Sequence, residues 1–362
     1  MNESSTTRGQ RSALVERLGL LGWMVCLAWV IAPPARGGQP ADFEAVTILE
    51  GLTGPVRLAA SPTGQTLYVL QEQDAAVIGV DLSDPSKRWT AVPKTPGLTA
   101  VAIGCIDSST IAIVGHGSEE WSLCTHRLTA PGTAVDATPV QSVPLGKSTA
   151  KASLVRVVIG AARDSLAVAG LPAPMAPILR ATVTGSRLGS ASTRRCPRGF
   201  AARPVATIQS GYGEWGFLIP EAEGVFFSWY SPGGTERLMH LATGLTNVRD
   251  AVACRDSGLL WVLAGEPGSL EHPEGLWRLD ARFAGGRQGA AAVAVLPLPN
   301  AQSLVCLPKQ SIAVALGGDP ARVVLVTPHD QSNKSNKSNK STEPTEPTEP
   351  TTGTESQEVK NR

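Results

Sequence analysis

The stretch VRLAASPTGQTLYVLQEQDAAVIGVDL, residues 56–82, decides the fold. It contains three apolar runs of strand length, each too short to form a stable helix. The first two runs are separated by Ser61, Pro62, Thr63 and Gly64, residue types that favour a tight turn between antiparallel strands. A fourth run, RWTAVP at 88–93, follows after a polar segment. The stretch therefore predicts one antiparallel sheet of four strands.

The same arrangement recurs along the chain, at intervals of roughly 45–55 residues. The later copies begin near Ala102, Val158, Val205, Ala251 and Ser303. The lead-in Gly51-Leu52-Thr53 before the first copy returns as Gly244-Leu245-Thr246 before the fifth. Tandem units of four antiparallel strands at this period are typical of β-propeller blades. We therefore predict an all-β fold, a six-bladed β-propeller with four-stranded antiparallel blades.

The two ends of the repeat region complement each other. The sixth unit ends at its third strand near Pro328, while residues 42–52 (DFEAVTILEGL) form a strand with no unit of its own. We expect Phe43–Leu49 to pair as the outer strand of the last blade, because this pairing closes the ring and removes exposed edges. The alternative fold is two stacked β-sandwich domains.

The segments outside the repeats predict an export signal at the N-terminus and a disordered tail at the C-terminus. Residues 1–37 combine a basic start, an apolar run at 18–32 and small residues, the layout of a signal peptide or of an uncleaved signal anchor. The propeller is expected over 42–330. Residues 331–362 consist of polar tripeptide repeats and predict a disordered, low-complexity tail. We expect a secreted, periplasmic or cell-envelope protein with no membrane contact beyond the N-terminal signal.

The charge balance restricts the partners. Lys plus Arg is 32 and Asp plus Glu is 31, giving a formal net charge of +1. A nucleic-acid-binding protein usually carries a basic excess, so this class is excluded. We expect a monomer with an unidentified protein, peptide or glycan ligand.

A family resemblance rests on SPTGQTLYVLQEQDAAVIGVDLSDP, residues 61–85. This stretch resembles the blades of bacterial extracytoplasmic β-propellers of the lactonase-like, NHL-like and YVTN-like group. The resemblance implies the fold, since propellers serve binding, scaffolding and catalysis alike. Lactonase-like propellers hold a divalent cation with carboxylate and Asn side chains near the channel. The first repeat here begins VRLAAS, without an acid or Asn at that place.

Five cysteines follow the N-terminal segment. Cys105, Cys254 and Cys306 end the first strand of their repeats, and we expect equivalent positions in adjacent blades to lie beyond disulfide reach. We predict that these three and Cys124 are small, buried, unpaired core residues. Cys196 lies in an Arg-rich segment and is the candidate for a reactive thiol.

Two groups of loops carry the candidate site residues. The segments leading into the first strands offer Arg57, Arg156, Arg203, Arg249 and Asp250. Arginines at several blades would favour an anion, although each could instead cap its strand or pair with a nearby carboxylate. The segments between second and third strands offer His116, Glu119, Glu120, Glu266, Glu271, His272 and Glu274. Histidine with carboxylate suits a metal ion or acid–base chemistry, and the alternative is solvated loop charge.

The leading functional hypothesis is a non-enzymatic binding or scaffolding module. The competing hypothesis is a divalent-metal-dependent hydrolase of the lactonase-like type, using His116 and Glu119, or Glu266, Glu271 and His272. A third is a surface protein tethered by an uncleaved anchor. The sequence has no nucleophile-elbow, H-E-x-x-H or Walker motif, so we assign no catalytic residue and no metal ligand. A divalent cation is the one cofactor considered.

Overall fold

The chain divides into two units, Met1–Pro328 and His329–Arg362. The computed structural model describes residues 43–54, 56–71, 75–95, 97–118, 120–129, 138–149, 155–160, 163–176, 178–194, 206–209, 215–221, 224–230, 236–243, 245–254, 259–280 and 292–328, all in the first unit. The predicted signal segment and tail lie outside these ranges. Within them, no helix is long and apolar enough to cross a membrane.

The strands of the described residues form six antiparallel sheets of four strands each. The first sheet contains β2 (Val56–Ala60), β3 (Thr66–Gln71), β4 (Ala76–Asp81) and β5 (Arg88–Val92). The second contains β6 (Thr99–Cys105), β7 (Thr110–His116), β8 (Glu120–Arg127) and β9 (Gln141–Lys147). The third contains β10 (Arg156–Ile159), β11 (Ser165–Ala169), β12 (Ile178–Thr184) and β13 (Arg187–Arg194).

The remaining sheets continue the same order. The fourth contains β14 (Ala206–Gln209), β15 (Trp215–Glu221), β16 (Gly224–Tyr230) and β17 (Glu236–Thr243). The fifth contains β18 (Asp250–Cys254), β19 (Leu259–Ala264), β20 (Gly275–Asp280) and β21 (Val293–Pro297). The sixth contains β22 (Ala301–Cys306), β23 (Ile312–Leu316), β24 (Ala321–Pro328) and β1 (Phe43–Leu52). The predicted all-β fold of four-stranded antiparallel sheets is confirmed.

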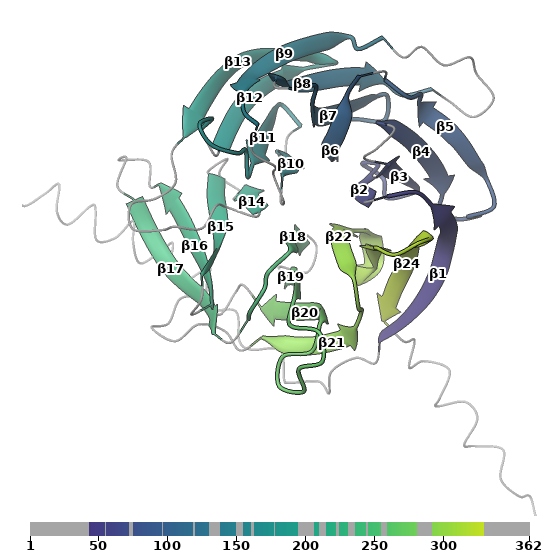
Figure 1. Ribbon diagram of the computed structural model, residues 1–362, viewed down its shortest axis with the longest axis vertical. Helices are drawn as coiled ribbons and strands as arrows, with labels where there is room; N and C mark the ends of the chain where they lie inside the picture. The colour runs from purple at the N-terminus through teal and green to yellow at the C-terminus, as the bar shows by residue number, and fades with distance from the viewer. Residues whose placement is uncertain are drawn as a thin grey trace, which may run out of the picture. The chain divides into compact units, whose positions relative to one another are not determined.

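The sheets follow one another around a common centre, with their first strands innermost (Figure 1). β2, β6, β10, β14, β18 and β22 each contact the next in this order, and β22 contacts β2. β1 pairs antiparallel with β24 from Phe43 opposite Pro328 to Leu52 opposite Ala321, as the sequence predicts. The ring is therefore closed by the N-terminal strand, which excludes the alternative of two stacked sandwiches.

Buried apolar side chains fill the spaces between neighbouring sheets. Trp121 and Leu123 of the second sheet pack in one cluster with Val157 and Leu166 of the third. Between the fifth and sixth sheets, the buried Trp261 ring makes an edge contact with the Phe43 ring, with centroids 5.4 Å apart. Each such side chain contributes roughly 1.5–3 kcal/mol through burial. Because sheets pack on both sides, strands such as β7 and β23 are buried at consecutive positions, which explains the continuous apolar runs in the repeats.

The prediction that no disulfide joins adjacent blades is wrong. Cys254 and Cys306 form a disulfide between the ends of β18 and β22, with Cα atoms 5.7 Å apart. Both strands are the innermost of their sheets, and innermost strands converge toward the centre, so equivalent positions come within disulfide reach there.

Two other cysteines behave as predicted. Cys105 and Cys124 are buried and unpaired. Burial raises the pKa of the Cys105 thiol to about 12, which keeps it protonated and unreactive. Cys196 lies outside the described residues.

Closure of the ring generates a test at Gly64, in the turn between β2 and β3. Gly64 has a φ of +67°, and a Cβ there would overlap Pro308 Cδ in the turn after β22. We expect Gly64→Ala to lower the free energy of unfolding by about 2–5 kcal/mol, combining left-handed backbone strain with overpacking. Urea unfolding measures the loss.

Gly97→Ala is the matched control, because Gly97 has a φ of +76° and nothing within 4 Å of the added Cβ. It should lose only the backbone contribution of about 1–2 kcal/mol. Equal losses for the two variants would contradict the packing of the first-sheet turn on the sixth sheet.

Candidate functional site

A cavity of about 430 Å³ lies at the centre of the ring. Its described lining comes from β2, β6, β10, β18 and β22 and from residues just before or after these strands. The charged residues of this lining are four arginines and one aspartate: Arg57, Arg156, Arg163, Arg249 and Asp250. The lining therefore concentrates positive charge in a chain whose net charge is +1.

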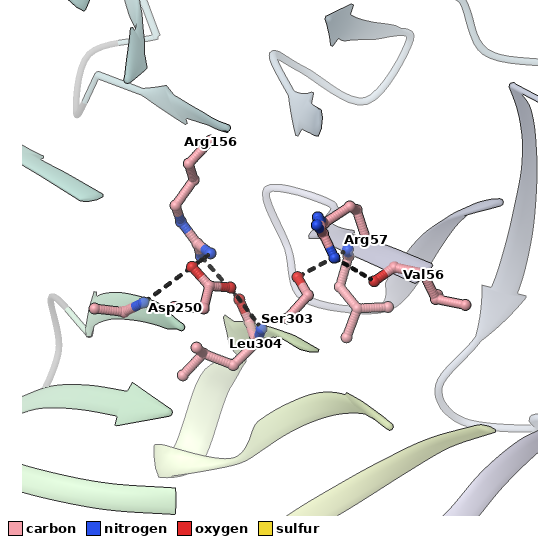
Figure 2. Close-up of polar contacts among 8 residues, drawn as sticks. Val56, Arg57, Arg156, Asp250, Ser303 and Leu304 are labelled. Carbon is pink, nitrogen blue, oxygen red and sulfur yellow. Dashed lines mark hydrogen bonds and ion pairs between the residues drawn. The ribbon is translucent and has the colours of Figure 1, made fainter. Parts of the chain in front are cut away.

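Arg156 and Asp250 form an ion pair at one mouth of this cavity (Figure 2). Arg156 is the first residue of β10 and Asp250 the first of β18. The ion pair therefore joins the third sheet to the fifth, and the fourth sheet stands between these two in the ring. The side chains are 14% and 8% exposed. Low exposure makes this pair stronger, but also more costly to desolvate, than a surface ion pair.

The pair also binds the backbone of the sixth sheet. Arg156 Nη2 donates to the Leu304 carbonyl oxygen at 2.8 Å. Asp250 Oδ2 accepts from the Leu304 N–H at 2.9 Å, and Oδ1 accepts from the Ala251 N–H at 2.9 Å. The two side chains thus satisfy one N–H and one C=O on the inner edge of β22, as a neighbouring strand would. We name Arg156, Asp250 and Leu304 the inner clasp.

Arg57 is the second residue of β2 and lines the cavity, so it lies at the same end of the inner strands as Arg156, and Figure 2 shows it beside Ser303 of β22. Its Nη1 approaches the Val56 carbonyl oxygen at 3.5 Å. Ser303 Oγ accepts from the Leu58 N–H at 3.4 Å, and this bond covers part of the inner edge of β2. β2 and the inner clasp therefore both bond to the sixth sheet, through Ser303 and Leu304, and two predicted arginines, Arg57 and Arg156, line the same end of the cavity.

Arg249 has a different partner. It forms an ion pair with Glu274, whose Oε1 also accepts from the Asn300 N–H at 2.7 Å. Nε and Nη2 of Arg249 are buried without a hydrogen-bond partner. This pair joins the segments that lead into β18, β20 and β22, and it is the alternative role considered for the arginines, pairing with a nearby carboxylate.

The predicted His and Glu candidates of the two loops do not come together in the described part of the chain, although within one loop the Glu266 N–H donates to the His272 carbonyl oxygen at 2.9 Å. The His116 ring stacks on Trp121 at 4.8 Å, and its Nδ1 lies 2.9 Å from the Gly117 carbonyl oxygen. The His272 ring lies 6.3 Å from that of Trp277. Glu120, Glu266 and Glu271 are exposed, while Glu119 and Arg203 lie outside the described residues. His116 and His272 belong to the second and fifth sheets, which are not neighbours in the ring.

The cavity lining does not fit the divalent cation that the lactonase-like resemblance implies. Asp250 is the one carboxylate of the described lining, and both of its oxygens already accept hydrogen bonds. The Arg156 guanidinium beside it would repel a cation. Among the described residues, no group of three or more His, Cys, Asp or Glu could hold a metal ion.

Three features of the site were not predicted from the sequence. They are the ion pair of Arg156 with Asp250, the hydrogen bonds of this pair to Leu304, and the place of Arg163 in the lining. The first two join positions 94 and 148 residues apart, and no local pattern signals them. Arg163 had a signal, because it follows the start of its turn at the same distance as Gly64 follows Ser61.

No protein-family model matches the sequence, and no curated protein matches it. Solved structures do resemble the fold. The PQQ-bound aldose sugar dehydrogenase of Streptomyces coelicolor has a TM-score of 0.53 at 13% identity, covering 80% of this chain and 99% of its own. A gluconolactonase of Xanthomonas campestris has a TM-score of 0.52 at 15% identity, covering 82% of this chain and 93% of its own.

A streptogramin B lyase structure has a TM-score of 0.50 at 11% identity, covering 79% of this chain and 98% of its own. These neighbours bear out the predicted resemblance, and the chain has a lactonase-like β-propeller fold. Identities of 11–15% carry the fold alone.

The inner clasp generates a stability test. Asp250→Ala should lower the free energy of unfolding by about 3–5 kcal/mol, because it leaves Arg156 buried without its counter-charge. The double variant Arg156→Met/Asp250→Ala should lose less than the sum of the two single variants, since it removes the uncompensated charge. Urea unfolding of all four proteins completes the cycle. Single losses that add to within about 0.5 kcal/mol would contradict the coupling.

Proposed function

We propose that the chain is an exported six-bladed β-propeller that binds an acidic ligand at the centre of its ring and does not catalyse a reaction. The ligand is a protein, peptide or glycan that presents a carboxylate or a similar oxyanion. The observation that carries this proposal is the described cavity lining, which holds four guanidinium groups and one carboxylate, with Arg156 paired to Asp250 and Arg249 paired to Glu274 beside the lining.

The inner clasp supports binding through preorganisation. Arg156 is held by Asp250 and by the Leu304 carbonyl oxygen, so its guanidinium is already placed at the mouth. Arg57, near the start of β2, lines the same end of the cavity. Guanidinium groups form strong, directional hydrogen bonds to carboxylates, and groups fixed before binding lose less entropy.

The chemistry of the lining supports binding rather than hydrolysis. The described lining contains no histidine, and its carboxylate is engaged by Arg156 and two backbone N–H groups. It offers no evident general acid–base pair. The poor fit to a divalent cation removes the main support for the metal-dependent alternative.

The disulfide supports the exported location. Cys254 and Cys306 are bonded, and disulfides persist mainly in oxidising compartments such as the periplasm or the cell exterior. N-terminal sequencing of the mature chain tests this part of the proposal. A start just after Gly37 is expected for a cleaved signal, whereas retention of residues 1–37 would indicate an anchor. A chain found in the cytoplasm with Cys254 reduced would refute export.

Calorimetric titration with triglutamate, at low salt, tests the binding. We expect triglutamate to bind, triglutamine not to bind, and Arg57→Gln to weaken binding about tenfold, which corresponds to ~1.4 kcal/mol. Added salt should weaken binding further, because the attraction is electrostatic.

Arg88→Gln is the control, since the Arg88 side chain is exposed on β5 and its Nε donates to the Pro85 carbonyl oxygen outside the cavity. The proposal fails if triglutamine binds as tightly as triglutamate. It also fails if Arg57→Gln binds triglutamate like the unaltered protein.

A further inference from the structure

Arg163 lies at the other end of the same cavity. It belongs to the turn between β10 and β11, while Arg156 begins β10. Both residues line the cavity, as do residues 157–160 between them. β10 runs from Arg156 to Ile159, and Arg163 stands in the turn that follows. A strand rises about 3.3 Å per residue, so the backbone positions of Arg156 and Arg163 lie roughly 15 Å apart along the strand direction.

Arg163 occupies a backbone position that favours glycine. Its turn matches the turn at Gly64: the Gly64 N–H donates to the Ser61 carbonyl oxygen at 2.9 Å, and the Arg163 N–H donates to that of Gly160 at 3.0 Å. Gly64 has a φ of +67° and Arg163 a φ of +59°. A residue with a Cβ is strained there, so arginine is an unfavourable choice for the turn itself.

The Arg163 guanidinium is held in place. Its Nη1 donates to the Ile106 carbonyl oxygen at 2.7 Å, in the corresponding turn of the second sheet. One hydrogen bond engages one of the five N–H donors of the group. The side chain is thus anchored at this mouth and keeps further donors that an oxyanion could accept from.

The wall between the two mouths carries no charge. The described lining residues other than the four arginines and Asp250 are neutral, and they include Ala60, Ile103, Val157, Val252 and Val305. A ligand reaching from one mouth to the other would therefore meet a cationic group, a neutral passage and a second cationic group.

We propose that the ligand is an elongated dianion, with one acidic group at Arg57 and Arg156, an uncharged middle in the cavity, and a second acidic group at Arg163. This inference rests on the proposed binding function and adds the length and charge pattern of the ligand. Arg163 would then be retained for binding, despite its strain in the turn.

A homologous series of α,ω-dicarboxylates tests the inference, each titrated beside the monocarboxylate of equal length. We expect the dicarboxylates that span the cavity to bind about tenfold tighter than their monocarboxylates, the factor that ~1.4 kcal/mol represents. Shorter dicarboxylates should show no such preference. In Arg163→Gly, the affinity of the long dicarboxylates should fall to that of the monocarboxylates.

Thermal unfolding of Arg163→Gly separates binding from folding. Glycine suits the positive φ, but the variant also loses the hydrogen bond to the Ile106 carbonyl oxygen, so the two effects oppose each other and the unfolding temperature should stay within a few degrees of that of the unaltered protein. Lys309→Gly is the matched control, because Lys309 is a basic residue with a φ of +59°, in the turn after β22, but outside the cavity lining. It should keep the preference for long dicarboxylates.

A preference that survives in Arg163→Gly, or that is lost equally in Lys309→Gly, would overturn the inference. If monocarboxylates bind through Arg57 but length and the second charge have no effect, the inference fails while the proposed function stands. If neither the carboxylates nor triglutamate bind, both fail.

Discussion

The open inner edges of the sheets are the constraint on which this ring depends. Each innermost strand has a neighbour on one side only, so its other edge presents backbone N–H and C=O groups to the centre. Arg156 and Asp250 satisfy such groups on Leu304, and Ser303 does so on Leu58. Polar side chains at the starts of inner strands therefore complete the hydrogen bonding that closure of the ring leaves open.

The side chains that satisfy these backbone groups also position the charges of the candidate site. A guanidinium that covers a carbonyl on β22 must stand at the mouth of the cavity, and it needs a carboxylate nearby to be buried at tolerable cost. The carboxylate in turn is occupied by Arg156 and two N–H groups, which leaves it poorly suited to a metal ion. The same bonds that complete the edge of β22 thus favour an anionic ligand over a cation-dependent reaction.

Much of the fold could be predicted from the sequence, because its signals are local. Turn residues such as Pro62 and Gly64 mark each hairpin, and the unpaired strand at Phe43–Leu49 indicates how the ring closes. The Cys254–Cys306 bond could not be predicted in this way, because the approach of β18 and β22 depends on how far all the sheets converge. Spacing within one repeat contains no information on that convergence.

The candidate site likewise has one part that the repeats predict and another part that depends on the closed ring. The positions of Arg57, Arg156 and Asp250 at the starts of inner strands follow from the repeat, whereas their partners come from other sheets and depend on the closed ring. Arg163 is the intermediate case: aligning its turn with that of Gly64 reveals a residue that local backbone preference does not explain. Lys309 has the same φ of +59° outside the cavity lining, so strain alone does not mark a site; Arg163 differs in bonding the Ile106 carbonyl oxygen and bordering the cavity, and these contacts lie outside its turn.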